Sequence, residues 1–282
     1  MRQGQAGGAG RYMTETSSQK RTSGYIEIDG HRTWFADADG VGESVLMLHG
    51  GLSDSEGMLD ALEPAIGDRF RVLAFDRRGH GRTADTDAAF HYDDMASETI
   101  AVIEKLIGGP THLVGWSDGG IVSLLVALRR PDLVRSLVLI GTNYHFNGMV
   151  PMTPGDGGVP EMLRARYAER SPDGADHFAV VLKKSFAMFA AEPTLTTEDL
   201  RKISAPALVI VGDDDLMTLA HTASLYESLP AGQLAVVPGS SHAVVFEKPE
   251  FVGQLIRGFL NSPEDPAEMF PVRRRSAVRK NT

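Results

Sequence analysis

Short apolar runs that end at turns rich in glycine, aspartate or histidine constrain the fold of this chain more than any other feature. Because both faces of each run are apolar, each is expected to be a strand buried on both sides, as in a parallel sheet. Stretches with helical spacing separate the runs, and strands that alternate with helices predict an α/β fold with a mostly parallel, doubly wound sheet. The runs are residues 44–48, 71–75, 111–116, 134–140, 206–211 and 234–237.

The remaining pattern predicts an edge hairpin and the helices. Residues 25–28 and 31–36 alternate apolar and polar side chains around an Asp29-Gly30 turn, which is typical of a β-hairpin. Between the runs, apolar residues recur at helical spacing, and glycine and proline at 108–110 end one such stretch. Helices are expected at residues 58–66, 92–107, 119–129, 219–229 and 249–260.

The segment at 144–203 is much longer than the single crossover helix that would join two neighbouring parallel strands. It is rich in glycine and proline at 152–160, and helical spacing follows at 161–170 and 176–191. A connection of this length in a compact domain is usually functional or forms a small domain. We expect it to be a small helical lid, inserted above the carboxyl ends of the strands.

The rest of the chain divides into a core and two ends. The core is expected at 24–143 and 204–261. Residues 1–23 have no apolar region of a secretory signal and predict a flexible leader, within which Met13 is an alternative start. Residues 262–282 are rich in proline and arginine and predict a flexible basic tail. Since no apolar stretch of about 18 residues occurs, a cytoplasmic protein is expected.

Charge and cysteine content exclude several classes of function. The 28 lysines and arginines stand against 37 aspartates and glutamates, which gives a formal net charge of −9. An acidic protein repels phosphate backbones and anionic lipids, so neither a nucleic acid nor a membrane is expected as a partner. The chain has no cysteine, which rules out a thiolate nucleophile, a disulfide or a cysteine metal site.

The segment Gly115-Trp116-Ser117-Asp118-Gly119 carries the strongest chemical signal. It follows a predicted buried strand and opens a predicted helix, which is the context of a nucleophile elbow. The turn is sharp, so the residues flanking the serine must be small, as both glycines are. It raises the Ser117 hydroxyl above the sheet, and the N-terminus of the next helix directs N–H groups to where negative charge develops during acyl transfer. Ser117 is therefore predicted to be the nucleophile.

A serine hydroxyl needs a general base, and the chain has nine histidines. His242 directly follows the last predicted strand, at the sheet edge where Ser117 is expected, and is predicted to be the base. His49 also ends a strand but precedes the glycines of an expected oxyanion turn, and His80 is interpreted as structural. The other histidines have no motif context and are expected at the surface: His31, His91, His112, His145, His177 and His221.

The base in turn needs a carboxylate that fixes its tautomer and stabilises the imidazolium. Three adjacent candidates, Asp213, Asp214 and Asp215, follow the strand at 206–211. Only one of them can have this role, and the others are expected to face solvent or to cap the following helix.

An acyl-transfer site also needs two N–H donors for the oxyanion. One is expected from the backbone of Asp118, the residue after the nucleophile, and the other from Gly51, in the turn His49-Gly50-Gly51-Leu52. Gly51 has no side chain, so its backbone can approach a substrate closely. This chemistry requires neither a metal nor a cofactor, and none is expected.

In this combination the motifs resemble those of serine hydrolases with the α/β-hydrolase fold, over about residues 24–261. That family places its acid three residues after the glycine that ends the strand, here Gly212, so the resemblance selects Asp215. It also implies that the turn at 76–81 is structural and that the insertion is a lid. Five segments occur in the family's order: His49-Gly50-Gly51, residues 76–81, residues 115–119, residues 212–215 and residues 239–242.

The same fold supports many reactions, so the site residues must decide between them. Haloalkane dehalogenases and epoxide hydrolases of this family use an aspartate nucleophile, which Ser117 argues against. Cofactor-free haloperoxidases and perhydrolases usually have a methionine after the serine and an aromatic residue in the oxyanion turn, where this chain has Asp118 and Gly51. A carbon–carbon bond hydrolase, an acyltransferase and, with weaker support, a cofactor-free perhydrolase stay open as alternatives on this fold. A non-catalytic receptor is disfavoured because the whole triad is present.

Residues 115–121 are particularly similar to the valacyclovirase, or biphenyl-hydrolase-like, group of amino-acid-ester hydrolases. There the acid beside the nucleophile receives the α-ammonium group of the substrate, so the resemblance implies that the Asp118 side chain binds a substrate amine. The alternative is that Asp118 caps the helix or faces solvent and contributes only its N–H. The sequence thus predicts a serine hydrolase that cleaves a small carboxylic ester or lactone, with an amino-acid ester as one form of that substrate.

Overall fold

The computed structural model describes residues 21–150, 159–263 and 269. Most of the expected leader and tail, and most of the glycine- and proline-rich stretch at 152–160, therefore lie outside the described residues.

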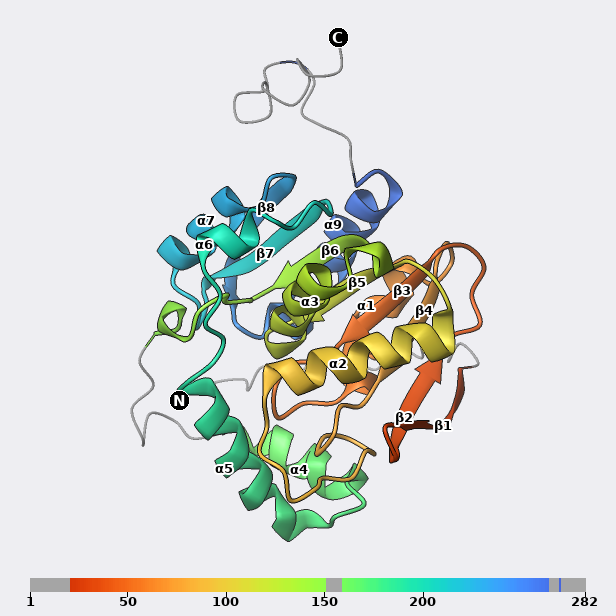
Figure 1. The fold of residues 1–282 in the computed structure, drawn as a ribbon. Coiled ribbons are helices and arrows are strands. Elements are labelled where there is room, and N and C mark those ends of the chain that lie inside the picture. The colour runs from red at the N-terminus through yellow and green to blue at the C-terminus, as the bar shows by residue number, and fades with distance from the viewer. Residues whose placement is uncertain (1–20, 151–158, 264–268, 270–282) are drawn as a thin grey trace, which may run out of the picture.

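The described residues form an eight-stranded sheet at the centre of the molecule (Figure 1). Its strands are β1 (Thr22–Ile28), β2 (His31–Asp37), β3 (Ser44–Leu48), β4 (Arg71–Phe75), β5 (Thr111–Trp116), β6 (Val134–Ile140), β7 (Ala207–Asp214) and β8 (Gly232–Ser241). They lie in the order β1-β2-β4-β3-β5-β6-β7-β8. The hairpin β1–β2 and the pair β2–β4 are antiparallel, and the other pairs are parallel. The predicted mostly parallel, doubly wound sheet is confirmed.

Helices cover both faces of this sheet (Figure 1). They are α1 (Ser55–Ile66), α2 (Tyr92–Val102), α3 (Asp118–Arg129), α4 (Glu161–Arg170), α5 (Phe178–Phe189), α6 (Thr197–Leu200), α7 (Leu219–Ser228), α8 (Val244–Glu247) and α9 (Pro249–Asn261). One apolar core cluster joins the sheet to α1 and α9 through residues such as Leu62 and Ile256. The other joins it to α2 and α3 through residues such as Met95 and Val122. The strands are therefore buried from both sides, as their continuous apolar runs predict.

Some elements differ in their bounds from the prediction. The expected helix at 92–107 is α2 followed by one π-helical turn, Ile103–Ile107, which ends at Gly108 with a φ of 74°. The strands β7 and β8 extend beyond their apolar runs, because they continue to pair past an irregularity between Gly212 and Asp214. This pairing depends on the neighbouring strand, so an apolar run alone does not predict where the strand that contains it ends.

The insertion at 144–203 is joined to the core by ion pairs. Its helices α4 and α5 lie together beyond one end of the sheet (Figure 1). Arg166 of α4 donates two hydrogen bonds to Asp54, at 2.8 and 2.7 Å, and Lys184 of α5 donates to Asp85 at 2.7 Å. Since Asp54 and Asp85 follow β3 and β4, these contacts tie the insertion to the loops that come after those strands.

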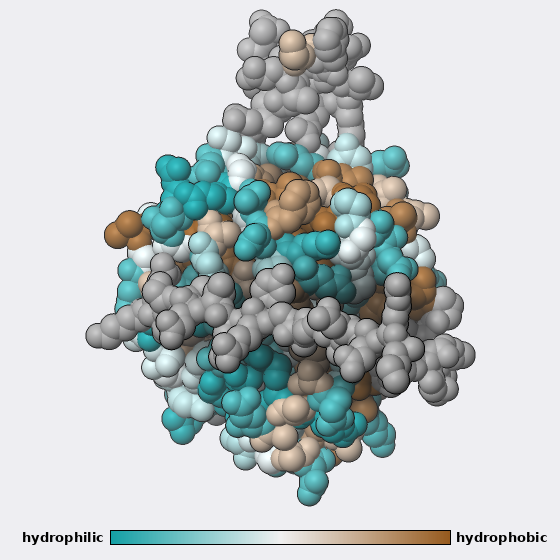
Figure 2. Space-filling model, turned by 180° about the vertical axis from the view of Figure 1, so that it is seen from behind, coloured by the Kyte–Doolittle hydropathy of each residue, from teal (hydrophilic) through white to brown (hydrophobic). Residues whose placement is uncertain are grey.

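The surface on the side of α1 and α9 is mixed, with apolar residues gathered mainly in its upper half (Figure 2). Large apolar side chains exposed on β8 and α9 include Leu234, Val236 and Phe251. Within the described part of the chain, no helix combines the length and the apolar character that crossing a bilayer requires.

Replacing Gly119 by alanine is expected to destabilise the fold strongly, because the added Cβ would lie 2.0 Å from the carbonyl oxygen of Leu48. Overpacking of this kind costs about 1–3 kcal/mol or more, so the free energy of unfolding should fall by that amount. Urea denaturation measures this change. Gly258→Ala is the matched control, since its added Cβ would have no atom within 4 Å among the described residues outside its own stretch of helix. In helix α9 that change should stabilise by about 0.5–1 kcal/mol. Equal effects at both sites would contradict the packing argument.

Candidate active site

Ser117 lies at a strained turn between β5 and α3. Its φ of 54° and ψ of −117° are unusual for a residue with a side chain, and such strain costs about 1–3 kcal/mol where the surroundings enforce it. The surroundings are tight: a Cβ on Gly115 would lie 2.3 Å from the backbone of Gly119, and one on Gly120 would lie 1.9 Å from Thr142 Oγ1. The glycines around the serine are therefore required by close packing against backbone at Gly115 and against the Thr142 side chain at Gly120, as expected of a nucleophile elbow.

The structure brings Ser117, His242 and Asp215 into one hydrogen-bonded chain. His242 Nε2 lies 3.0 Å from Ser117 Oγ, and its Nδ1 lies 2.8 Å from Asp215 Oδ1. A carboxylate only accepts, so Nδ1 carries the ring proton and Nε2 presents its lone pair to the serine hydroxyl. Trp116, next to the serine, donates from Nε1 to the His242 carbonyl at 2.8 Å, which fixes the loop that carries the imidazole.

Asp215 is held as an anion beneath the imidazole. Its side chain is completely buried and accepts further hydrogen bonds from the N–H groups of Met217 at 3.0 Å and Gly212 at 3.4 Å. Burial by itself raises the pKa of Asp215, but the hydrogen bond and the charge of His242, together with these N–H groups, outweigh it and lower the pKa below its ordinary value. The Asp215 carboxylate is therefore ionised at every pH at which the imidazolium needs a counter-charge.

The neighbouring acids of Asp215 have other surroundings. Asp213 and Asp214 are exposed, and Asp213 accepts a hydrogen bond from the N–H of Ser240 at 3.1 Å. Both therefore face solvent, which is the first of the two expected alternatives, while helix α7 is capped by the Thr218 side chain. Of the three adjacent acids, Asp215 alone is hydrogen-bonded to His242 in the described structure.

One expectation about the other histidines is also wrong. His112 is buried in β5, where it lies 2.7 Å from Ser136 Oγ and 3.1 Å from Glu43 Oε2. It was expected at the surface because no motif surrounds it. Its burial follows from the central position of β5 between β3 and β6, which leaves both faces of this strand covered.

The glycine turn after β3 packs directly against the serine segment. A Cβ on Gly50 would lie only 2.8 Å from the Trp116 ring. A Cβ on Gly51 would lie 2.5 Å from Asp118 Oδ2 and 2.8 Å from Phe189 Cζ of α5. Both glycines are thus needed to let the turn approach the nucleophile segment, and α5 of the insertion reaches the same point.

The Asp118 carboxylate neither caps a helix nor faces solvent. Ser117 occupies the N-cap position of α3, and Asp118 is only 4% exposed. Tyr92 donates its hydroxyl to Asp118 Oδ1 at 2.9 Å, whereas Oδ2 has no hydrogen-bond partner among the described residues. Burial raises the pKa of Asp118, although the charges of Arg77 and His242 and the Tyr92 hydrogen bond oppose this shift. The alternative that Asp118 is a cap or a solvated acid is therefore wrong.

Arg77 and Tyr92 also lie beside this site, although the sequence does not predict it. Arg77 lies in the glycine-rich turn after β4, which was interpreted as structural, and its motif position was the only available signal. Tyr92 begins α2, and nothing in its sequence context marked it. Both are buried, and Arg77 is the largest completely buried side chain among the described residues.

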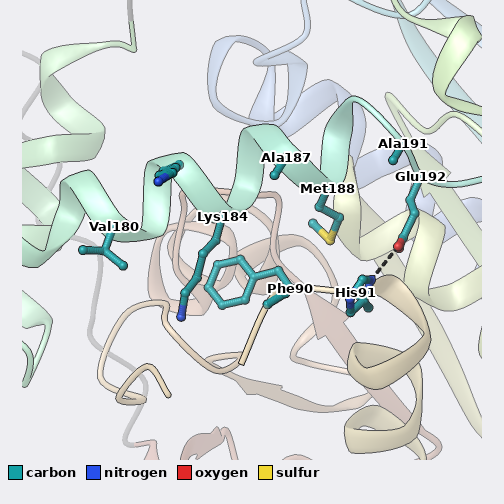
Figure 3. Close-up of a pocket in the computed structure, with 10 residues that line it drawn as sticks. Phe90, His91, Val180, Lys184, Ala187, Met188, Ala191 and Glu192 are labelled. Atoms are coloured by element: carbon teal, nitrogen blue, oxygen red, sulfur yellow. Dashed lines mark hydrogen bonds and ion pairs between the residues drawn. The ribbon is translucent and has the colours of Figure 1, made fainter. Parts of the chain in front are cut away.

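A separate cavity of about 370 Å³ lies between α5 and the segment that precedes α2 (Figure 3). Its walls are mostly apolar and include Phe90 and Met188, with Lys184 lying alongside the Phe90 ring. At one end His91 Nδ1 lies 2.6 Å from Glu192 Oε1. None of the three hydrogen-bonded residues described above lines it, so this cavity is distinct from the site at Ser117.

Known proteins are similar to this chain over most of its length. The model of the alpha/beta hydrolase family matches residues 45–255. A 2-hydroxy-6-oxo-6-(2'-aminophenyl)hexa-2,4-dienoic acid hydrolase of Metapseudomonas resinovorans is 28% identical, over 89% of this chain and 96% of the relative. Human serine hydrolase BPHL is 24% identical over 90% of each chain.

A solved structure supports the same architecture. The meta-cleavage product hydrolase CumD of Pseudomonas fluorescens IP01 superposes with a TM-score of 0.72 over 84% of this chain and 97% of its own, at 22% identity. An identity this low supports the fold alone, whereas the family match and the curated relatives together support a hydrolase enzyme. The chain belongs to the alpha/beta hydrolase family.

Proposed function

We propose that the protein is a serine hydrolase that cleaves a small carboxylic ester or lactone through an acyl-enzyme. The observation that carries this proposal is the hydrogen-bonded chain from Ser117 Oγ through His242 to Asp215, with links of 3.0 and 2.8 Å. Both distances are within the reach required between a nucleophile, its base and the residue that orients the base.

In the proposed reaction, His242 Nε2 removes the proton from Ser117 as the hydroxyl oxygen attacks the ester carbonyl. Asp215 stabilises the imidazolium that results, and the N–H groups of Gly51 and Asp118 stabilise the oxyanion. The tetrahedral intermediate collapses when His242 returns the proton to the departing alcohol. Water, activated by the same histidine, then hydrolyses the acyl-enzyme and restores the serine. Each step uses groups of this chain, the ester and water.

The insertion at 144–203 is proposed to be the lid over this site. Its support is the position of Phe189, whose ring lies close to Gly51 of the proposed oxyanion turn. A lid that lies here would exclude water from the ester and select its acyl group by shape.

The experiment that tests the proposal combines active-site labelling with a substrate panel. A fluorophosphonate should label the wild-type protein once, at Ser117, because an activated serine attacks phosphorus as it attacks a carbonyl. The panel should contain short nitrophenyl esters, lactones and a 2-hydroxy-6-oxo dienoic acid. Hydrolysis of the esters supports the proposal, and absence of both labelling and ester turnover contradicts it.

The dienoic acid is in the panel because carbon–carbon bond hydrolysis is the main alternative on this fold. The activity named for the Metapseudomonas relative supports it. Such a substrate carries a carboxylate, which needs a cationic partner. Arg166 and Arg170 of the insertion are already paired with Asp54 and Glu56, which favours an uncharged ester over an acid. Turnover of the dienoic acid above that of every ester would reverse this preference.

As a second candidate we propose that the ester carries an α-amino group, bound by Asp118. The observation in its favour is the buried Oδ2, which lacks a partner among the described residues and lies beside the Gly51 turn. A charge-assisted hydrogen bond contributes about 1.5–3 kcal/mol, so wild type should prefer an α-amino ester over its deaminated analogue by at least about tenfold in kcat/KM. The preference should disappear in Asp118→Asn. An equal loss on both esters would show that Asp118 acts without contacting the amine.

A further inference from the structure

The oxyanion turn is anchored from below by a buried arginine. Arg77 is completely buried, and its Nη2 donates a hydrogen bond to the carbonyl oxygen of Gly50 at 3.2 Å. His49 Nδ1 lies 2.7 Å from the same oxygen. Two buried side chains, Arg77 and His49, therefore contact the Gly50 carbonyl oxygen.

The tautomer of His49 follows from its second contact. The backbone N–H of Arg77 donates to His49 Nε2 at 3.1 Å, so Nε2 is the acceptor and Nδ1 carries the ring proton. Burial, followed by the charge of Arg77, lowers the pKa of His49 well below its ordinary value, so the ring is neutral. Arg77 Nη2 and His49 Nδ1, which lie 3.2 Å apart, are thus both donors to the carbonyl oxygen of Gly50.

A fixed carbonyl also fixes the N–H on the other side of the same peptide bond. The bond between Gly50 and Gly51 is trans, since a cis peptide occurs in the described residues only between Glu192 and Pro193. In a trans peptide the C=O and the N–H point in opposite directions. With the Gly50 carbonyl held toward the interior, the Gly51 N–H is turned away from Arg77 and His49.

Glycine alone would not keep this peptide in one orientation, because it has the widest choice of backbone conformations. The donors on the Gly50 carbonyl remove that freedom. Burial lowers the pKa of Arg77, and nearby negative charges oppose this shift, with Asp118 contributing most. Asp118 is itself hydrogen-bonded to Tyr92. The charge of Arg77 therefore also acts on the residue after the nucleophile, which is the source of the other proposed oxyanion donor.

We infer that Arg77 is a positioning residue, which orients the Gly51 N–H toward the oxyanion by holding the Gly50 carbonyl. The inference rests on the proposed function, because it needs an oxyanion to form at Ser117. It assigns to the first arginine of the turn after β4 a role in transition-state stabilisation rather than in bracing a loop. Arg77 itself does not touch the substrate.

The test is a comparison of an ester with its thionoester in Arg77→Met, Arg77→Lys and Arg78→Met. Sulfur accepts hydrogen bonds weakly, so a misdirected N–H should slow the oxygen ester much more than the thionoester. Loss of one oxyanion donor costs about 10²–10³ in kcat, so misdirecting one should cost about 10–100-fold, with KM changed less than about threefold. The ratio of kcat/KM for the oxygen ester to kcat/KM for the thionoester should therefore fall at least about tenfold in Arg77→Met.

The other variants separate this role from a merely structural one. Arg77→Lys keeps a buried cation with a donor, so it should recover part of the ratio. Arg78→Met is the matched control, because Arg78 pairs with Glu98 at 3.3 Å rather than with the Gly50 carbonyl, and this change should leave the ratio unchanged. If Arg77→Met does not fold, the double variant Arg77→Met/Asp118→Asn, which removes both buried charges, takes its place.

The outcomes distinguish this inference from the proposed function. If the folded Arg77→Met or double variant keeps the wild-type ratio of oxygen-ester to thionoester kcat/KM, the role of Arg77 is overturned. Ester turnover that still depends on Ser117 leaves the proposed function intact in that case. If turnover does not depend on Ser117, the proposed function fails, and the role of Arg77 fails with it.

Discussion

Replacing Ser117 by alanine is expected to lower kcat on a nitrophenyl ester by about 10⁴- to 10⁶-fold. The change removes the oxygen that lies 3.0 Å from His242 Nε2 and leaves no other hydroxyl in that position. The residual rate would come from substrate binding and the oxyanion donors alone. Steady-state kinetics and loss of fluorophosphonate labelling measure the effect, and circular dichroism with thermal unfolding shows that the fold persists.

Ser123→Ala is the matched control for this change. Ser123 lies in the same helix, α3, and its buried hydroxyl donates to the carbonyl oxygen of Gly119 at 2.8 Å, away from His242. The same chemical substitution should therefore leave kcat and labelling close to wild type. The nucleophile assignment fails if Ser117→Ala keeps more than about a tenth of the activity while Ser123→Ala behaves as wild type.

Replacing Asp215 by asparagine is expected to lower kcat by about 10⁴-fold, the second largest effect among these variants. An amide side chain can donate to His242 Nδ1, which would place the ring proton on Nε2 and leave no lone pair for the Ser117 proton. It also removes the negative charge that stabilises the imidazolium. The side chain is nearly isosteric, so KM and the thermal unfolding midpoint should change little in comparison with kcat.

Asp214→Asn provides the control for Asp215→Asn, since it makes the same change one residue earlier at an exposed position. Its kcat should stay within about twofold of wild type. The pH dependence adds a further check: the pKa of Asp215 is lowered, so the carboxylate stays charged until the pH falls below its ordinary range. The aspartate therefore should not limit activity at neutral pH. Comparable losses in both variants would contradict the assignment of Asp215.

The features that could be predicted from the sequence are those encoded by neighbouring residues. The buried strands were visible as continuous apolar runs, and β6 has the predicted bounds, Val134–Ile140. The turn at Ser117 was visible because its strand, its glycines and its helix follow each other along the chain. The ends of β7 and β8 were not visible, because the pairing between these strands, rather than their own composition, extends them.

The sequence by itself therefore determined the fold class, the order of the elements and the position of the predicted nucleophile, all of which depend on local patterns of burial and turn formation. The family resemblance already selected Asp215 among three adjacent aspartates. Tertiary structure decided their surroundings, because it buries the Asp215 side chain against His242 and leaves Asp213 and Asp214 exposed. It also decided the surroundings of Asp118, since Arg77 and Tyr92 come from separate segments that meet only when α2 and the turn after β4 pack beside α3.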